Sequence, residues 1–516
     1  MTTRSLPVVD PALVTPTAVG SPRPALAAAA PVAEYALEAA ALPRFHIWTL
    51  GCQMNRSDSE EMAGALLAAG CAEASSLEAA DLIVINSCAI REAAEQKVIG
   101  RMGALERLRA AHPGLRVVLT GCAVREANRG QLARRYPAVD LFLRPDEEGQ
   151  LVERLGLAAP TAPGALGART HLARGSAVQA WLPIIYGCDK TCTYCIVPFS
   201  RGPERSRPFD EVLAEARHLA AAGYREVTLL GQNVNSYGHD LAPEARFASV
   251  DAARTMGRRL DLAGRPDIAA LLRAIDGLRT VDGRPAIPRL RFITSHPWDL
   301  GERLIAAMAE CPSVCEHLHL PVQSGSDAVL RRMGRQYTVA AYLGLVARLR
   351  GAIPGISLTT DVIVGFCGET EAQFEATLAL LREVRFDQVF AAAFSPRPGT
   401  PAARLGDDVP AAEKRRRLNE LLAVQEEIGR ERYRAWLGRT TEVLVEAERP
   451  RRTHDHEADD AAPGAQVEAG KGSVRLVGRN RENRLVHLDG PLGLVGRFAP
   501  VRIEHAGPYA LAGRLA

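Results

Sequence analysis

Short apolar runs alternate with helical patterns over most of this 516-residue chain, and this alternation restricts the fold more than any other feature. In the first third of the chain, runs of strand length cover residues 46–50, 81–85, 116–120 and 139–143. Helical patterns follow them from about residues 57, 91, 126 and 147, and Ser57 with Glu60 has the spacing of an N-terminal capping box. Strands that alternate with helices form a parallel, doubly wound sheet. We therefore expect an α/β domain over residues 44–160.

Cysteines follow three of these expected strands directly. Cys52, Cys88 and Cys122 each come one to three residues after a strand-length run. The carboxyl ends of parallel strands meet along one edge of a sheet, which is where such folds bind ligands. The alternative is three unrelated buried thiols, because free cysteine often packs as a small core residue. Core cysteines would project from strand faces and would not recur in the loops, so the pattern favours a site with three thiolate ligands.

A second group of cysteines follows the apolar run Trp181 to Tyr186. Cys188, Cys192 and Cys195 have the spacing C-x3-C-x2-C. Three such thiolates can hold three irons of a [4Fe–4S] cube, which normally takes one thiolate per iron, so that the fourth iron stays open to a chelating molecule such as S-adenosylmethionine (AdoMet). The alternatives are a zinc site and plain buried thiols, but a structural zinc site requires four ligands, and no further Cys or His follows at that spacing.

The strand-then-helix rhythm continues beyond this loop. Strand-length runs cover residues 181–186, 226–230, 289–294, 316–320, 357–364 and 388–394, and residues 239–266 interrupt the series as a surface insertion. Six such units over residues 177–436 predict an open, partial TIM-type barrel, with its site at the carboxyl ends of the strands. Polar and glycine residues that follow the runs are the candidates for contacts with AdoMet: Gly231, Gln232, Asn233, Gln323, Ser324 and Asp361.

The remaining segments are of other kinds. Residues 1–43 are rich in Ala and Pro, which predicts a disordered tail, and residues 158–176 have the composition of a linker. No run of about 18 apolar residues occurs, so we expect no membrane span. Ten cysteines in a chain of this length do not form a disulfide framework, which favours a reducing, cytoplasmic compartment. The net charge of +3 is too small to indicate a nucleic-acid partner by itself.

The apolar period changes from that of helices to that of strands after a charged helix at residues 414–436. Alternating runs at 440–445, 473–477, 484–488 and 498–503 predict a small all-β barrel over residues 437–506. Basic residues of this barrel are candidates for contacts with RNA: Arg475, Arg479, Arg481 and Arg484. The alternative is exposed charge on a domain that only increases solubility.

Taken together, these segments resemble the methylthiotransferase family of radical-AdoMet enzymes from about residue 44 to residue 506. The first domain is similar to the flavodoxin-like domain of that family, and the last to its RNA-binding TRAM domain. The stretches that carry the resemblance are Gly51-Cys-Gln-Met-Asn55, Asn86-Ser-Cys-Ala-Ile-Arg-Glu92, Gly121-Cys122, residues 188–195, Leu230-Gly-Gln-Asn-Val-Asn235, His317-Leu-His-Leu-Pro-Val-Gln-Ser-Gly-Ser326 and Asp361-Val-Ile-Val-Gly-Phe366.

The resemblance also indicates a branch of the family. Gly51-Cys-Gln-Met-Asn55 and Gly478-Arg-Asn-Arg-Glu-Asn-Arg484 are similar to the tRNA branch, which methylthiolates isopentenyladenosine at position 37. The branch that modifies a ribosomal-protein aspartate usually has Pro-Lys-Asn after the first cysteine, and the threonylcarbamoyl-adenosine branch has Lys-Val-Asn. An RNA-binding protein with purely structural clusters is a further alternative, but such clusters normally have four protein ligands.

The family resemblance implies two [4Fe–4S] clusters and two roles for AdoMet. The cluster at Cys188, Cys192 and Cys195 would cleave AdoMet to a radical that removes the hydrogen at C-2 of adenine. The cluster at Cys52, Cys88 and Cys122 would hold the sulfur to be inserted, and a second AdoMet would supply the methyl group. The implied partners are a tRNA anticodon stem-loop, a flavodoxin- or ferredoxin-type electron donor and a sulfur-supply system, and we expect a monomer.

Overall fold

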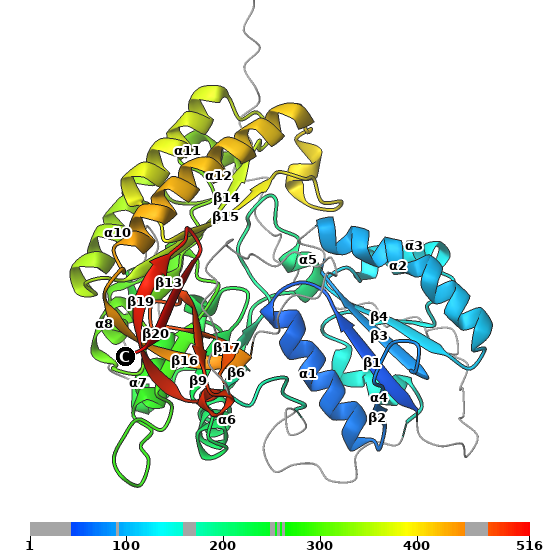
Figure 1. The fold of residues 1–516 in the computed structure, drawn as a ribbon. Coiled ribbons are helices and arrows are strands. Elements are labelled where there is room, and N and C mark those ends of the chain that lie inside the picture. The colour runs from blue at the N-terminus through cyan, green and yellow to red at the C-terminus, as the bar shows by residue number, and fades with distance from the viewer. Residues whose placement is uncertain are drawn as a thin grey trace, which may run out of the picture.

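The computed structural model describes residues 43–88, 92–157, 172–247, 253–254, 259–260, 264–448 and 473–516. Figure 1 shows an N-terminal α/β body beside a larger α/β body, with a small β-structure packed against the latter. Residues 1–42 of the predicted 1–43 tail, most of the 158–176 linker and part of the 239–266 insertion lie outside the described residues. The fold class expected from the sequence is confirmed, because parallel sheets and a small closed barrel are both present.

The N-terminal body is built on one parallel sheet of strand order β2-β1-β3-β4-β5. Residues alternate between its two faces: Ile83 and Ile85 of β3 join one apolar core, and Leu82 and Val84 join the other. Helices therefore cover both faces, as predicted. The elements are β1 (Arg44–Thr49), α1 (Gln53–Ala68), β2 (Ala72–Glu73), β3 (Leu82–Ser87), α2 (Glu92–Ala111), β4 (Arg116–Gly121), η2 (Glu126–Asn128), α3 (Arg129–Arg135), β5 (Leu141–Phe142), η3 (Glu148–Gln150) and α4 (Leu151–Arg154).

Helix α1 begins four residues before the predicted start at Ser57. Cys52 is its N-cap residue, and no side chain caps this end, so the predicted capping box with Glu60 is wrong. The reason is the sharp turn at Gly51, whose φ is +126°, because it feeds the chain into the helix immediately. Ser57 is fully buried inside the helix.

The larger body is an open barrel of six parallel strands. Pairing runs β6-β9-β12 in one half and β13-β14-β15 in the other, and a bridge between Leu290 and Val314 joins the halves. The predicted six units are therefore confirmed. The strands are β6 (Gln179–Pro183), β9 (Glu226–Leu230), β12 (Arg289–Phe292), β13 (His317–His319), β14 (Ser357–Val364) and β15 (Gln388–Ala393). Two short pairs are added, β7 (Ile185–Tyr186) with β8 (Arg205–Ser206), and β10 (Ala253–Arg254) with β11 (Arg259–Leu260).

Helices cover the outer face of this barrel, and its main apolar core lies between the two layers. The α-helices are α5 (Val197–Arg201), α6 (Phe209–Ala221), α7 (Ile268–Asp276), α8 (Glu302–Glu310), α9 (Asp327–Arg332), α10 (Val339–Ala352), α11 (Glu371–Val384) and α12 (Ala411–Arg434). Short 3-10 turns are η4 (Val234–Ser236), η5 (Ala245–Phe247), η6 (Pro297–Asp299) and η7 (Pro401–Arg404).

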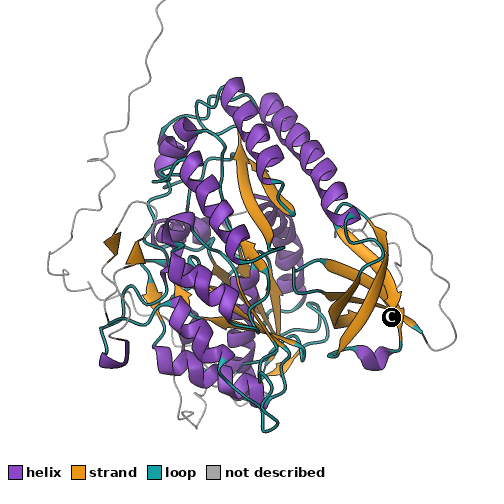
Figure 2. Ribbon diagram, turned by 90° about the vertical axis from the view of Figure 1, so that its left-hand side faces the viewer, coloured by secondary structure: helices purple, strands orange, loops and turns teal. Residues whose placement is uncertain are grey.

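A closed five-stranded barrel forms the C-terminal part, and Figure 2 shows it at the end of the long helix α12. Its elements are β16 (Thr440–Glu448), β17 (Val474–Arg479), β18 (Leu485–Gly490), η8 (Leu492–Leu494), β19 (Phe498–Ala506) and β20 (Ala510–Leu515). The sequence predicted four of the strands. It did not indicate β20, because the stretch Ala510-Leu-Ala-Gly-Arg-Leu515 contains none of the β-branched or aromatic residues that favour strands.

Arginines fasten this barrel to the amino ends of the open-barrel strands. Arg289, at the start of β12, donates to the carbonyl oxygens of Arg479 at 2.6 Å and Glu442 at 2.9 Å. Arg291 donates to the carbonyls of Arg481 at 2.8 Å and Asn480 at 2.7 Å. The small barrel therefore closes the end of the open barrel that is opposite to the carboxyl ends of its strands.

Candidate active site

The three strand-end thiols of the N-terminal body lie on adjacent strands. Cys52, Cys88 and Cys122 follow β1, β3 and β4, which are neighbours in the sheet. The chain passes closely enough there to require glycine: a Cβ at Gly51 would lie 2.7 Å from Cβ of Cys88, and one at Gly121 would lie 2.2 Å from the carbonyl oxygen of Ser87. The sheet thus brings the three predicted thiols together, as their positions after the strands predicted.

Burial dominates the chemistry of the Cys122 thiol. It raises the pKa of Cys122 to about 11, against the opposing effect of Arg201, and the neighbouring Cys52 and Cys88 raise it further. A buried thiol with such a pKa stays protonated unless a cation compensates the thiolate, and iron binding supplies that compensation. The donor set therefore fits a metal cluster.

A polar network that the sequence interpretation missed surrounds this triad. Arg201, from α5 of the open barrel, donates to Sγ of Cys122 at 3.2 Å and to Oδ2 of Asp58 at 2.6 Å. Asn55 receives a third bond from Arg201, at 3.3 Å, and donates to the carbonyl of Ser87 at 3.0 Å. Sequence gave one indication of this network, since Asn55 belongs to the quoted Gly51–Asn55 motif, but nothing in the sequence linked it to residue 201.

The second triad lies on the loop that follows β7. The main-chain nitrogen of Thr193 donates to the carbonyl of Met333 at 2.9 Å, and its hydroxyl donates to the carbonyl of Arg332 at 2.8 Å. Gly334 has φ +70°, and a Cβ there would lie 2.5 Å from the carbonyl oxygen of Thr191. The segment 332–334 therefore holds the loop of Cys188, Cys192 and Cys195 against the barrel.

The two triads lie within electrostatic reach of each other. Burial raises the pKa of Cys195 to about 12, Cys192 raises it further, and Cys122 of the other triad adds to the effect. Burial likewise raises the pKa of Cys188. The structure thus brings the two predicted groups of thiols to the same junction between the N-terminal body and the open barrel.

All ten cysteines are described, and none of them forms a disulfide. Within the described part of the chain, no three His, Cys, Asp or Glu side chains are gathered closely enough to hold a single metal ion. A cube presents one iron to each thiolate, so its ligands are spread around four corners instead of converging on one point. Two triads with this spread suit clusters better than the zinc alternative.

Among the buried polar atoms without a hydrogen-bond partner, four lie just after strands of the open barrel and a fifth lies just after α9. They are Nε2 of Gln232, Oδ1 of Asn233, Oγ of Ser295, Oε1 of Gln323 and Nε of Arg335. Buried polar groups normally have partners, so such a gathering indicates that a polar ligand supplies them. AdoMet, with its amino, carboxylate and ribose groups, has the required donors and acceptors.

Arg335 is the residue of this set that sequence reasoning passed over. It is 5% exposed, and its guanidinium is close enough to Cys192 and Cys195 for both to raise its pKa, although burial alone would lower it. The stretch Met333–Thr338 had no distinguishing signal, because an arginine after a Gly is common in loops. Its position beside the second triad is visible only in three dimensions.

The residues predicted to contact AdoMet differ in the contacts that they make within the protein. Oε1 of Gln232 accepts from the nitrogen of Gly187 at 2.6 Å, and Nδ2 of Asn233 donates to Asp299 at 2.7 Å. A Cβ at Gly231 would lie 2.3 Å from Cγ2 of Ile185, so glycine is needed there for packing. Gln323 has φ +73°, and Ser324 is fully buried near Thr377. Their roles toward AdoMet stay predictions.

Asp361 points instead onto the open inner face of β13–β15. Its Oδ2 lies 3.3 Å from Nε2 of His319, and it is paired in register with Phe390. His319 meets the Phe390 ring edge-on, with centroids 5.7 Å apart. Phe390 is 47% exposed, whereas Val389 on the opposite face packs in the core. This face offers an aromatic ring and a polar pair to a planar ligand.

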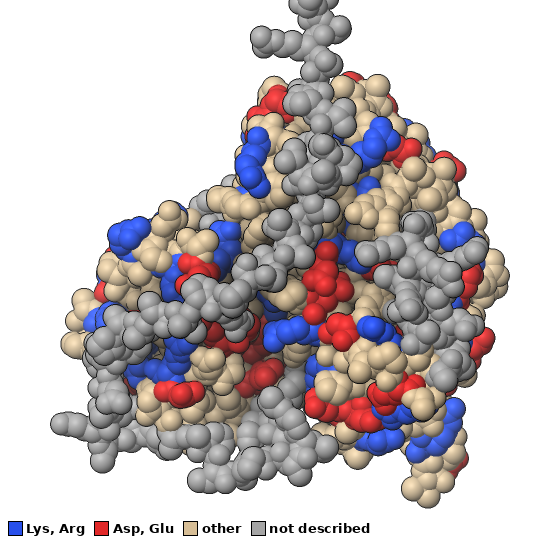
Figure 3. Space-filling model, turned by 180° about the vertical axis from the view of Figure 1, so that it is seen from behind, with Lys and Arg blue, Asp and Glu red and all other residues tan. Residues whose placement is uncertain are grey.

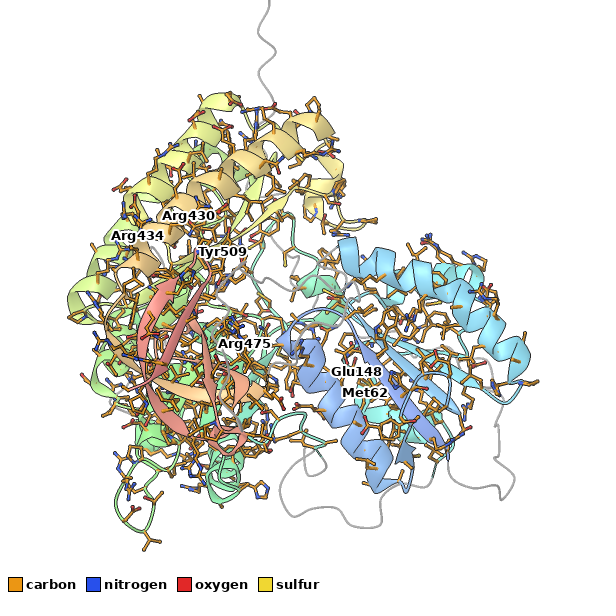
Figure 4. All side chains as sticks on the ribbon, viewed as in Figure 1. Met62, Glu148, Arg430, Arg434, Arg475 and Tyr509 are labelled. Atoms are coloured by element: carbon orange, nitrogen blue, oxygen red, sulfur yellow. The ribbon has the colours of Figure 1, made fainter. Side chains whose placement is uncertain are left out.

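The predicted RNA residues divide into two pairs. Arg481 makes an ion pair with Glu316 at 2.7 Å, and Arg484 is 4% exposed and paired with Asp387. Both hold the small barrel to the open barrel, so we withdraw them as RNA contacts. Arg479 is half-buried near Glu446, and Arg475 lies on the barrel as labelled in Figure 4; their RNA contacts stay predictions.

Comparisons with known proteins agree with this architecture. Residues 182–381 match the family model of the radical SAM superfamily, and residues 44–144 match that of the uncharacterized protein family UPF0004. The fold, the cysteine loop and the strand-end polar atoms define a radical-AdoMet enzyme. Within that class, the chain belongs to the family of the tRNA-2-methylthio-N(6)-dimethylallyladenosine synthases.

Relatives of that name carry the assignment. One from Roseiflexus sp. (strain RS-1) is 42% identical over 482 residues, which is 92% of this chain and 90% of that protein. One from Chloroflexus aurantiacus is 42% identical over 91% of both chains, and one from Geobacillus thermodenitrificans is 40% identical over 92% of this chain and 83% of that protein. A solved structure of the radical S-adenosylmethionine methyltransferase TsrM from Kitasatospora setae is 15% identical, covers 68% of this chain and 67% of that one, and has a TM-score of 0.45, which adds nothing to the assignment.

Proposed function

We propose that this chain methylthiolates C-2 of N(6)-dimethylallyladenosine at position 37 of tRNA. The observation that carries the proposal is the meeting of two cysteine triads at one junction, where Arg201, six residues after Cys195, donates to Sγ of Cys122 at 3.2 Å. One triad alone would serve many radical reactions, whereas sulfur insertion needs a radical source and a sulfur carrier within reach of the same carbon. The family assignment supports the substrate, because the relatives are named for this reaction.

Cys188, Cys192 and Cys195 would hold one [4Fe–4S] cluster, and Cys52, Cys88 and Cys122 would hold the other. When bound, the clusters and AdoMet supply one-electron cleavage, removal of the C-2 hydrogen, and the sulfur and methyl groups. The chain itself binds the cofactor with the buried polar atoms at the strand ends, excludes water by burying Cys88, Cys122 and Cys188, and orients the target base. The ring of Phe390, with His319 beside it, suits an adenine turned out of the anticodon loop.

Nucleoside mass spectrometry tests this function. In cells that lack the protein, we expect isopentenyladenosine to accumulate in tRNA and its 2-methylthio form to disappear, and the restored gene should return it. Unchanged tRNA would refute the substrate. A methylthio group on a ribosomal-protein aspartate would then point to the other branch with the same chemistry.

Two exposed arginines supply a candidate docking surface for the tRNA stem. Arg430 and Arg434 are four residues apart on one face of α12. A Cβ at Gly429 would lie 2.7 Å from the carbonyl oxygen of Pro508, so this turn of the helix touches the small barrel. Tyr509 is 40% exposed beside it, and Figure 4 labels the three side chains in one neighbourhood. Cations next to an aromatic ring suit RNA.

The positions of individual basic residues matter for tRNA binding, because the protein surface as a whole is not basic. The net charge is +3, and the face drawn in Figure 3 carries both positive and negative side chains. Removing the small barrel would be a poor test, since it would uncover Arg289 and Arg291. Substitutions on the surface avoid that defect.

The double substitution Arg430→Glu with Arg434→Glu is expected to weaken tRNA binding and to reduce its salt dependence. Each lost phosphate contact lowers the slope of log affinity against log salt by roughly 0.7 to 0.9. Filter binding at several salt concentrations measures it. Arg415→Glu is the matched control, because Arg415 is exposed on α12 but lies about 22 Å from Arg430 along the helix axis. Equal slopes for the wild type and the double variant would exclude this surface.

The remaining partners are part of the same proposal. Reduction requires a flavodoxin- or ferredoxin-type donor, and each turnover consumes sulfur that a supply system must replace. A tRNA substrate and oxygen-sensitive clusters suit the cytoplasm. Among the described helices, none is long and apolar enough to cross a membrane.

A further inference from the structure

Arg201 is a buried cation that the reaction as described so far does not use. It is the last residue of α5, six residues after Cys195, and its side chain is 3% exposed. The segment that begins as the loop of one cysteine triad therefore ends inside the N-terminal body, at the other triad. A fully buried arginine is costly unless its charge is balanced and its donors are used.

The contacts of Arg201 are directed at the N-terminal triad. Its Nε lies 3.2 Å from Sγ of Cys122, and its Nη2 lies 2.6 Å from Oδ2 of Asp58 and 3.3 Å from Oδ1 of Asn55. Asn55 is itself fixed, because its amide donates to Leu50 and Ser87 carbonyls. The guanidinium thus donates through Nε to the sulfur, and through Nη2 to Asp58 and Asn55, which hold it in place.

The local charges favour this arrangement. The guanidinium of an arginine stays protonated in proteins, and the carboxylate of Asp58, 2.6 Å from Nη2 of Arg201, balances its charge. Glu148 also lies in the pocket, hydrogen-bonded to Thr120 at 2.8 Å, and burial followed by Asp58 raises its pKa. Figure 4 labels Glu148 inside the N-terminal body. One cation therefore faces the thiolates that iron would require.

We propose that Arg201 is a positioning residue of the N-terminal cluster: its hydrogen bond to the Cys122 sulfur fixes that ligand and makes the cluster easier to reduce. Hydrogen bonds to cluster sulfurs and nearby charge are the levers by which proteins set the potentials of iron–sulfur sites. Reduction adds negative charge, which a cation at the sulfur stabilises. Because Arg201 and Cys195 share one short segment, the same residue also sets the separation of the two triads.

The proposal rests on the proposed function only in taking Cys52, Cys88 and Cys122 as cluster ligands. Substitution of Arg201 by lysine or by glutamine separates the effect of its charge from the effect of its hydrogen-bond geometry. Arg201→Lys keeps the charge, but its single ammonium lacks the planar fork that reaches Cys122 and Asp58 together. Arg201→Gln removes the charge and keeps a shorter amide donor.

The test is an EPR-monitored redox titration of reconstituted protein in which residues 188, 192 and 195 are alanine, so that only the N-terminal cluster contributes. We expect Arg201→Gln to retain four irons per chain and to make the cluster harder to reduce by at least about tenfold at a given potential, which is about 59 mV for one electron. Arg201→Lys should shift it in the same direction by less. Arg125→Gln is the control, because Arg125 crosses the same junction to the carbonyl of Pro398, at 2.8 Å, without serving the thiols.

Every outcome of this titration either supports or overturns the proposal. An Arg201→Gln potential equal to that of Arg125→Gln, with full iron, would overturn the proposal. If Arg201→Gln loses the cluster, the potential of Arg201→Lys decides in its place, and an unchanged value would overturn the proposal. Absence of iron from the triple-alanine parent would instead refute the cluster ligands, and with them the proposed function.

Discussion

Cys188→Ala is expected to abolish cleavage of AdoMet, whereas Cys52→Ala should leave cleavage measurable and remove the methylthio product. The reason is the physical separation of the triads. Cys188, Cys192 and Cys195 lie on the loop held by residues 332–334 of the open barrel, beside the strand-end polar atoms. Cys52 is the residue at the N-cap position of α1 in the N-terminal body. Loss of one of three thiolates empties or disorders one cluster and leaves the loop of the other intact.

The measurement is anaerobic incubation with reductant and tRNA, followed by chromatography of 5′-deoxyadenosine and of the tRNA nucleosides. Cys71→Ala is the matched control, because Cys71 is a buried cysteine of the same body that packs in an apolar core away from the strand ends. It should retain both products. Full methylthio product from Cys52→Ala would exclude a role for that triad, and loss of all cleavage in Cys52→Ala would show that the triads do not act separately.

Most of the fold and the thiols of the site were predictable because they depend on short-range patterns. A short stretch of neighbouring residues is enough to predict a buried strand and the residue that follows it. Parallel topology then places Cys52, Cys88 and Cys122 at the edge of the sheet where the strands end. The same logic placed residues 188–195 and the strand-end Gln232, Asn233 and Gln323. The topology converts local order into spatial proximity without knowledge of any side-chain contact.

What the sequence did not reveal are contacts between side chains far apart along the chain. Arg201 meets Asp58 across 143 positions, and nothing near either residue indicates the other. Arg481 and Arg484 have the composition of an RNA-binding loop, but Glu316 and Asp387 determine that they face inward. For an arginine in a loop, exposure is decided by a partner that local pattern does not specify, which is why the predicted RNA residues were only half retained.

The second prediction with a large expected effect concerns the free energy of unfolding and the inward-facing Arg484. Arg484→Met is expected to reduce the free energy of unfolding by about 3 kcal/mol, since removing one partner of a buried ion pair leaves the other charge uncompensated. Arg484 is 4% exposed and its guanidinium lies over the rings of Tyr433, at 4.4 Å, and Trp436, at 5.4 Å. Arg432 still pairs with Asp387 at 2.9 Å, which keeps the expected loss at the lower end of the range for such pairs.

Urea unfolding, followed by tryptophan fluorescence, measures this loss, because Trp436 stands at the junction that Arg484 holds. Arg385→Met is the control: it breaks an ion pair with Glu431 whose side chains are 47% and 58% exposed, and should cost less than about 1 kcal/mol. Asp387→Asn in the Arg484→Met background should restore part of the loss, because it removes the carboxylate that Arg484 no longer neutralises and that Arg432 neutralises only in part. Equal stabilities of Arg484→Met and Arg385→Met would mean that the small barrel is not held through this pair, and the loop at 478–484 would again be open to RNA.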